Sequence, residues 1–136
     1  MKTKIAKKTF TLLCDDVRKE VGNKYSFMGV YGKKIIVSRI PAVLSKICLV
    51  VMLDDVKQDA IFGEVQFRQD GAETIKLKFN LSKKSKDIDV NLILVASPFK
   101  IEKAGIITIE IYFFDEEKPS ITHKVIVEEG PTEKMA

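Results

Sequence analysis

The chain has 136 residues, of which 46% are hydrophobic and 31% charged, so it is long enough for one buried core and too apolar to be disordered. No apolar run approaches the roughly 20 residues of a membrane helix, and the basic start Met1–Lys8 is not followed by the apolar stretch of a secretory signal. We therefore expect one cytoplasmic domain over residues 1–136, with flexible tails near 1–7 and 130–136 and no membrane contact.

The first third of the chain predicts short strands. Apolar and polar residues alternate over Thr9–Asp16, which favours a strand, although Asp15 or Asp16 could instead cap a short helix ending at Val21. The turn residues Gly22-Asn23 separate this segment from a second strand over 25–30. A brief third strand over 35–37 ends before Pro41, which lacks the amide hydrogen that a ladder needs.

The middle of the chain predicts a central strand and a hairpin. The segment Val43–Leu53 holds the longest apolar run, rich in β-branched residues, so we expect a strand covered on both faces. The dipeptide Asp70-Gly71 lies between two alternating segments and is a strong hairpin signal. Another alternating strand covers 90–95 and ends before Pro98.

The last strands give the clearest pattern. Isoleucines at 107, 109 and 111 alternate with polar or aromatic residues, and the same period returns over Ile121–Glu128 after the polar segment Asp115–Ser120. Two such runs predict adjacent antiparallel strands. About eight strands and no convincing helix predict an all-β fold, a two-layer antiparallel β-sandwich of immunoglobulin-like or C2-like character.

One stretch carries a resemblance. The sequence LLCDDVRKEVGNKYSFMGVYG over 12–32 resembles the opening of a family of small bacterial and phage proteins of unknown function. Pro41 before the long apolar strand, the Asp70-Gly71 turn and PFKIEKAGIITIEIYFFD over 98–115 follow the same layout. The resemblance implies a β-sandwich from a bacterium or phage, and it transfers no catalytic residue.

Acidic pairs at strand ends are weak candidates for a metal site. Calcium takes six to eight oxygen ligands, and C2-like sandwiches that bind it use loop aspartates. Such a site here needs Asp15, Asp16, Asp54 and Asp55 to converge, with Asp59 as a further ligand. Strand-end aspartates are more often solvated turn residues, so we expect no metal and no cofactor.

Lysine-rich loops are weak candidates for binding nucleic acid. A groove for a polyanion needs several lysines on one face with aromatic rings for stacking. The candidates are Lys33, Lys34, Lys83, Lys84 and Lys86. Such loops more often keep a β protein soluble and protect the edges of its sheets.

Catalysis has little support. His123 is the one histidine and falls on the apolar row of its strand, and no GxSxG motif is present. A thiol–histidine pair would need Cys14 or Cys48 beside it, but both cysteines lie in apolar runs and we expect buried free thiols. We therefore expect a protein that is not an enzyme.

Apolar residues on the polar side of the last hairpin are the best candidates for function. Tyr112, Phe114 and Ile126 alternate out of step with the core row, so they predict either a contact surface or a region covered by a loop. The leading expectation is a protein-binding or structural module that meets a partner or a second copy through this surface. The alternative is a weak metal- or nucleic-acid-binding protein.

Overall fold

The computed structural model describes residues 5–22, 24–82 and 89–131. Within them the chain is all-β, as predicted. Eleven strands are present in these ranges, more than the roughly eight expected, partly because short pieces next to Pro41 and Pro98 also pair. The strands are β1 (Lys8–Glu20), β2 (Lys24–Tyr31), β3 (Lys34–Val37), β4 (Ala42–Leu44), β5 (Ile47–Asp54), β6 (Ala60–Gln69), β7 (Ala72–Ser82), β8 (Val90–Ala96), β9 (Phe99–Ile101), β10 (Gly105–Phe113) and β11 (Ile121–Glu129).

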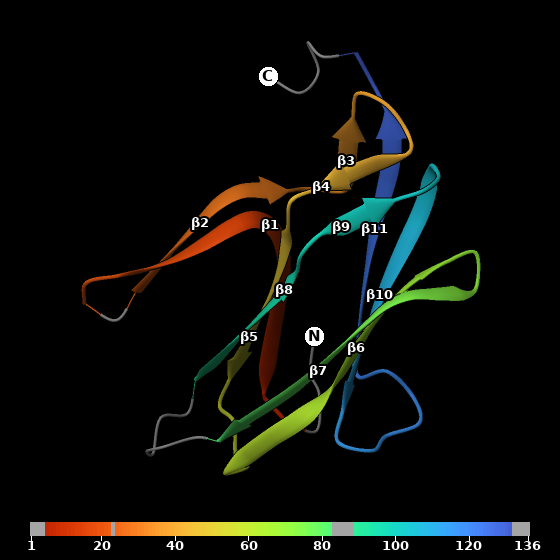
Figure 1. Cartoon of the computed structure of the whole chain (residues 1–136). Helices are drawn as coiled ribbons and strands as arrows, with labels where there is room; N and C mark the ends of the chain where they lie inside the picture. The colour runs from red at the N-terminus through yellow and green to blue at the C-terminus, as the bar shows by residue number, and fades with distance from the viewer. Residues whose placement is uncertain (1–4, 23, 83–88, 132–136) are drawn as a thin grey trace.

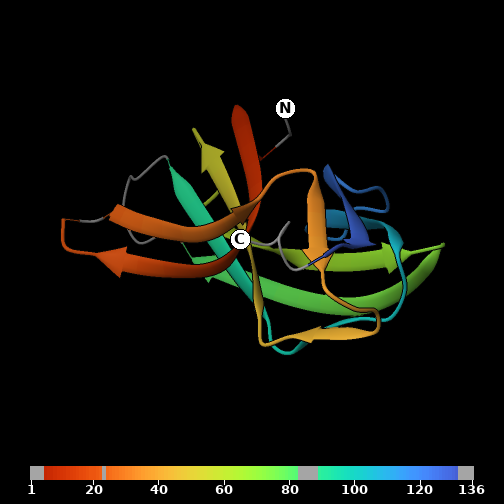
Figure 2. The ribbon, with the colours of Figure 1, turned by 90° about the horizontal axis from the view of Figure 1, so that it is seen from above.

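The strands form two large sheets and one small one. Sheet A has the order β2-β1-β5-β8, sheet B has the order β3-β11-β10-β6-β7, and sheet C pairs β4 with β9. Sheets A and B pack against each other through one shared core cluster, and their strands cross in the view from above (Figure 2). One exception to the antiparallel prediction is β3, which runs parallel to β11.

The main core lies between sheets A and B. One row of each strand points inward, and Leu49, Val51 and Phe67 are all at most 1% exposed. The alternation in β10 and β11 is confirmed, because Ile109 and Ile111 are fully buried while the residues between them are only partly so. Burial of these rows removes apolar surface from water at about 25 cal/mol per Å², which is the main stabilising contribution.

Local predictions are confirmed at the hairpin and the central strand. Asp70 and Gly71 both have positive φ, 53° and 79°, as a two-residue hairpin turn requires. Strand β5 is buried on both faces along most of its length, but it begins only at Ile47, because Ala42–Leu44 forms β4 of sheet C. The rival helix after Asp15 is wrong, since β1 continues as a strand to Glu20.

The ordered structure begins earlier than expected. Ile5 and Ala6, which we assigned to a terminal tail, are buried in the main core, and the Lys7 amide donates to the Asp54 carbonyl at 2.9 Å. Ile5 and Ala6 pack against the sheets because removal of their apolar side chains from water lowers the free energy of the folded state. At the other end, the Gly130 amide donates to the Val37 carbonyl at 3.0 Å.

Strands β1 and β2 extend beyond the rest of sheet A. Strand β1 pairs with β5 only over Lys8–Cys14, whereas it pairs with β2 up to Glu20. The segments 15–20 and 24–29 therefore form a two-stranded arm, which projects away from the sandwich (Figure 1). The tip residue Val21 is 94% exposed.

Candidate interaction surface

The outer side of sheet A is apolar, and no pattern in the sequence had singled it out. In β1, Leu13 points toward the main core, whereas Phe10, Leu12 and Cys14 point outward. Pairing in register places the outward rows of β5 and β8 beside that row. We call the resulting surface the outer apolar face, and its outward side chains are Phe10, Leu12, Cys14, Val30, Cys48, Val50, Met52, Ile93 and Val95.

The centre of the outer apolar face is closely packed and its margins are open. Cys14, Cys48 and Val50 are at most 2% exposed, because larger neighbours surround them. Phe10 is 58% exposed, Val30 55% and Val95 48%. A contiguous surface with such exposed apolar side chains is typical of a protein contact site.

The two thiols at the centre of this face are buried and uncharged. Cys14 and Cys48 are directly opposite each other on β1 and β5, and both are free and buried, as predicted. Burial raises the pKa of each thiol above its ordinary value. They therefore remain protonated near neutral pH and contribute no charge to the face.

Charges lie at both ends of the outer apolar face. Lys8 is directly opposite Asp54 at one end. At the other end, the Lys46 ammonium lies 2.6 Å from an Asp16 carboxylate oxygen. The hydrogen bond from Lys46 lowers the pKa of Asp16 and raises that of Lys46. Each end thus carries one acid and one base.

A polar contact holds the base of the arm. The Tyr31 hydroxyl donates to an Asp15 carboxylate oxygen at 2.5 Å. Burial, and then this bond, raise the pKa of Tyr31, so the hydroxyl keeps its proton. Gly29 has φ +65° and faces the same carboxylate, and a Cβ on Gly29 would lie 2.2 Å from an Asp15 oxygen. The Asp15 carboxylate therefore occupies the space that a side chain at position 29 would need.

The aspartates proposed as calcium ligands do not converge. Asp54 is opposite Lys8, and Asp16 lies eight residues further along β1, roughly 26 Å of extended strand. Asp55 instead binds Lys57 at 2.9 Å. In the described ranges no three His, Cys, Asp or Glu side chains are placed to hold a metal ion. The two acidic pairs are far apart because they lie at opposite ends of the β1–β5 ladder.

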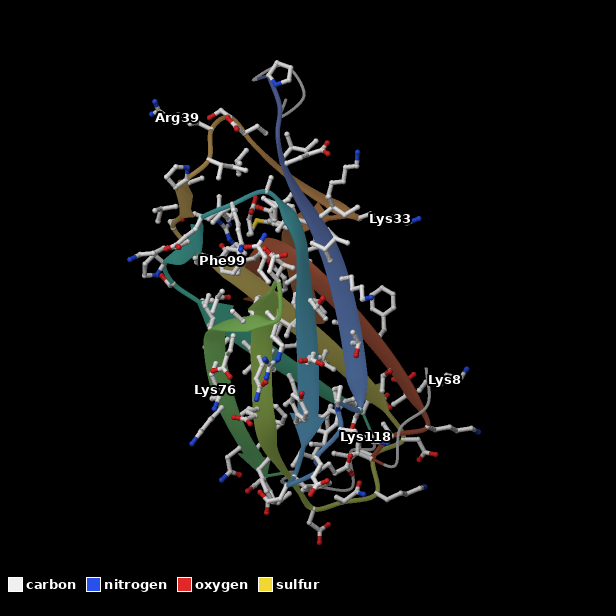
Figure 3. All side chains as sticks on the ribbon, turned by 90° about the vertical axis from the view of Figure 1, so that its right-hand side faces the viewer. Lys8, Lys33, Arg39, Lys76, Phe99 and Lys118 are labelled. Atoms are coloured by element: carbon white, nitrogen blue, oxygen red, sulfur yellow. The ribbon has the colours of Figure 1, made fainter. Side chains whose placement is uncertain are left out.

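Two of the five lysine candidates lie in the described ranges. Lys33 and Lys34 are exposed where β3 begins, and Lys34 is paired with Glu128 at 3.2 Å. The other candidates, Lys83, Lys84 and Lys86, lie outside the described residues. In Figure 3, Lys76 is on the opposite side of the view from Lys8 and Lys33.

His123 points toward the core, as its row predicted. It is paired with the fully buried Ile109, so both side chains are on the inner side of sheet B. Its Nε2 is buried without a hydrogen-bond partner among the described residues, and burial lowers the pKa of the imidazole. The two cysteines face the opposite side of the other sheet, so no thiol–histidine pair forms.

The predicted surface on the last hairpin is divided. Tyr112 is on the outer side of sheet B, but Ile126 is opposite Ile106, six residues along β10 and roughly 20 Å away. Phe114 follows the end of β10, packs partly against the core and contacts the Phe62 ring. These residues therefore do not form one patch, because the alternation gives the side of a sheet but not the distance along it.

Taken together, these features define an all-β protein with two large sheets, an apolar outer face and no group of three potential metal ligands among its described residues. No helix in those ranges is long and apolar enough to cross a membrane. The chain belongs to a family described as a family of unknown function (DUF6941), whose model matches residues 9–126. No curated protein and no solved structure matches it.

Proposed function

We propose that the protein is a non-catalytic, cytoplasmic binding module of bacterial or phage origin, and that its outer apolar face binds a second copy of the same chain. The observation that carries this proposal is the exposure of Phe10, Val30 and Val95 on one continuous face. Apolar surface of this kind gains free energy when it is removed from water by a second apolar surface.

The charge distribution favours a second copy over a charged partner. The outward positions of β1, β5 and β8 between the two ends include no ionised side chain. Each end carries both an acid and a base. In a two-fold arrangement, an acid of one copy therefore lies near a base of the other. This holds whether the corresponding ends or the opposite ends of the two faces meet. An isologous contact requires this kind of self-complementary surface.

The arm supplies a further argument for a partner. Its two strands pair only with each other beyond Cys14, and an isolated two-stranded ribbon is marginally stable in water. Val17 and Phe27 lie directly opposite each other in the arm and pack against the buried centre of the outer apolar face. A second copy on the face would therefore also contact the arm and stabilise it.

The size of the face indicates a weak dimer unless the arm takes part. Four strands about 4.8 Å apart and five residues of about 3.3 Å each give roughly 300 Å² in projection. Stable interfaces bury about 800 Å² on each partner. We therefore expect the arm to contribute to the contact and the dissociation constant to lie in the micromolar range.

The strand order supports the immunoglobulin-like form of the sandwich, which we include in the proposal. The adjacent strands β7-β6-β10-β11 have the connectivity of the C′-C-F-G strands of a variable-type domain, and β1-β5-β8 has that of A-B-E. Two hairpins joined through their inner strands make up the larger sheet in both. The C2-like alternative gains no comparable support.

Sedimentation velocity over a wide concentration range tests the proposed contact. We expect the wild type to self-associate, and Val95→Lys to remain monomeric because it places a charge in the apolar contact. Ile106→Lys is the matched control, since Ile106 is 52% exposed on the outer side of sheet B against 48% for Val95 on sheet A. A wild type that stays monomeric at all concentrations, or a control that dissociates equally, would refute the dimer. In that case a photo-crosslinker at position 95 would identify a different partner in the native cell.

A further inference from the structure

A second surface feature lies on the outer side of sheet B, away from the outer apolar face. A hollow of about 660 Å³ opens where β10 ends. Aromatic rings and carboxylates make up most of its lining, together with one lysine. The rings are Phe62, Phe79, Tyr112 and Phe114, and the charged groups are Glu64, Lys78, Asp115 and Glu116.

The backbone holds the aromatic rings in this position. The Phe114 amide donates to the Phe62 carbonyl at 2.7 Å, which continues the β6–β10 ladder past the end of β10. The two rings then meet with their centroids 5.0 Å apart and an angle of 78°. Phe114 has φ 59°, an unusual value for an aromatic residue. Strained residues of this kind concentrate at binding sites.

Glycine at position 63 allows the strands to approach closely beneath the hollow. A Cβ on Gly63 would lie 2.0 Å from the Tyr112 carbonyl oxygen and 2.8 Å from the Phe79 ring. Since a side chain cannot occupy this space, the Tyr112 backbone and the Phe79 ring both lie close to β6. The Phe79 ring points toward the core, where its centroid lies 5.8 Å from that of the Phe113 ring, so the outer aromatic lining consists of Phe62, Tyr112 and Phe114.

The charge of the hollow is opposite to that of the whole chain. Three carboxylates and one ammonium line it, whereas the chain carries +4. Glu64 lies 3.8 Å from Lys76, and Glu116 accepts a hydrogen bond from Ser120 at 3.0 Å. Asp115 makes no ion pair within the described ranges, so its charge is available to a ligand.

We propose that this hollow binds a compact organic cation, either the guanidinium of an arginine side chain or a quaternary ammonium group. Aromatic faces attract a cation placed within about 6 Å of the ring centre, and neighbouring carboxylates add to that attraction. The apolar part of the ligand packs on the same rings. This site is independent of the proposed dimer, because it lies on the other sheet.

NMR titration with separate probes tests the cation site. The probes are N-acetylarginine methylamide and tetramethylammonium chloride, with N-acetylglutamate methylamide and sodium chloride as comparisons. We expect saturable shifts in the amides of Gly63, Phe114 and Asp115 at millimolar concentrations. A response to the arginine probe alone identifies a guanidinium ligand, and a response to tetramethylammonium alone identifies a methylated ammonium.

Two variants test the chemistry of the lining. Tyr112→Leu keeps an apolar side chain but removes the π face, and Asp115→Asn removes one charge. Each should weaken binding of the cation by about threefold to tenfold. Glu129→Gln, which removes an exposed carboxylate at the far end of β11, should leave binding unchanged. Shifts that do not saturate, an equal response to the glutamate probe, or equal weakening by the control would overturn the proposal.

Discussion

Gly29 is a position where the effect of adding one methyl group can be worked out from its surroundings. Gly29→Ala places an L side chain at φ +65°, which costs about 1–2 kcal/mol in this region. The new Cβ also lies 2.2 Å from an Asp15 carboxylate oxygen, so that the carboxylate must move and its bond to Tyr31 is lost. A lost hydrogen bond of this kind adds about 1 kcal/mol. We expect Gly29→Ala to lower the free energy of unfolding by about 2–3 kcal/mol in total.

A matched control and a double-mutant cycle separate these two contributions. Gly22 has φ +91° and no atom within 4 Å of an added Cβ, so Gly22→Ala should show only the backbone cost. In urea unfolding, Gly29→Ala combined with Asp15→Ala should be less destabilising than the sum of the single variants, because the clash is absent without the carboxylate. Additive effects, or equal losses for Gly22→Ala and Gly29→Ala, would refute the role assigned to Asp15.

Two further predictions concern the inner face. Burial lowers the pKa of His123, so below the ordinary value of about 6.5 the unfolded chain takes up a proton that the folded chain does not. The free energy of unfolding should therefore fall by at most about 1 kcal/mol between pH 6.5 and pH 5.5, and urea unfolding of His123→Phe should show a smaller loss over this window. Phe67→Ala should lower stability by about 3–5 kcal/mol because Phe67 is 1% exposed in the main core. The same substitution at Phe10, which is 58% exposed, should cost far less, and similar losses at both positions in thermal unfolding would contradict the assignment of the faces.

Features that depend on local sequence could be predicted, and those that depend on distant pairing could not. The alternation of Ile109 and Ile111 and the turn at Asp70-Gly71 are determined by neighbouring residues. The parallel contact between β3 and β11 joins residues about ninety positions apart, and no local pattern reports it. Sheet C was missed because each of its strands has only three residues.

The candidate surface was missed for a related reason. The alternation over Thr9–Asp16 was recognised, but the row with Leu13 enters the main core and the row Phe10, Leu12 and Cys14 faces outward. The inward row, Thr9, Thr11 and Leu13, is the less apolar of the two, so the choice depends on which residues β5 presents to them. Tyr112 and Phe114 were recognised as unusual, whereas the importance of Phe62 and Gly63 depends on the approach of β6 to β10.

The pairing of β3 with β11 has a consequence for how the protein is made. Residues 34–37 are synthesised about ninety residues before their partner strand over 126–129. The nascent chain therefore carries an unpaired β3 until β11 has been made, with Ile35 and Val37 not yet covered. Sheet B closes only after synthesis of β11, so chaperones that shield extended apolar segments have that interval in which to act.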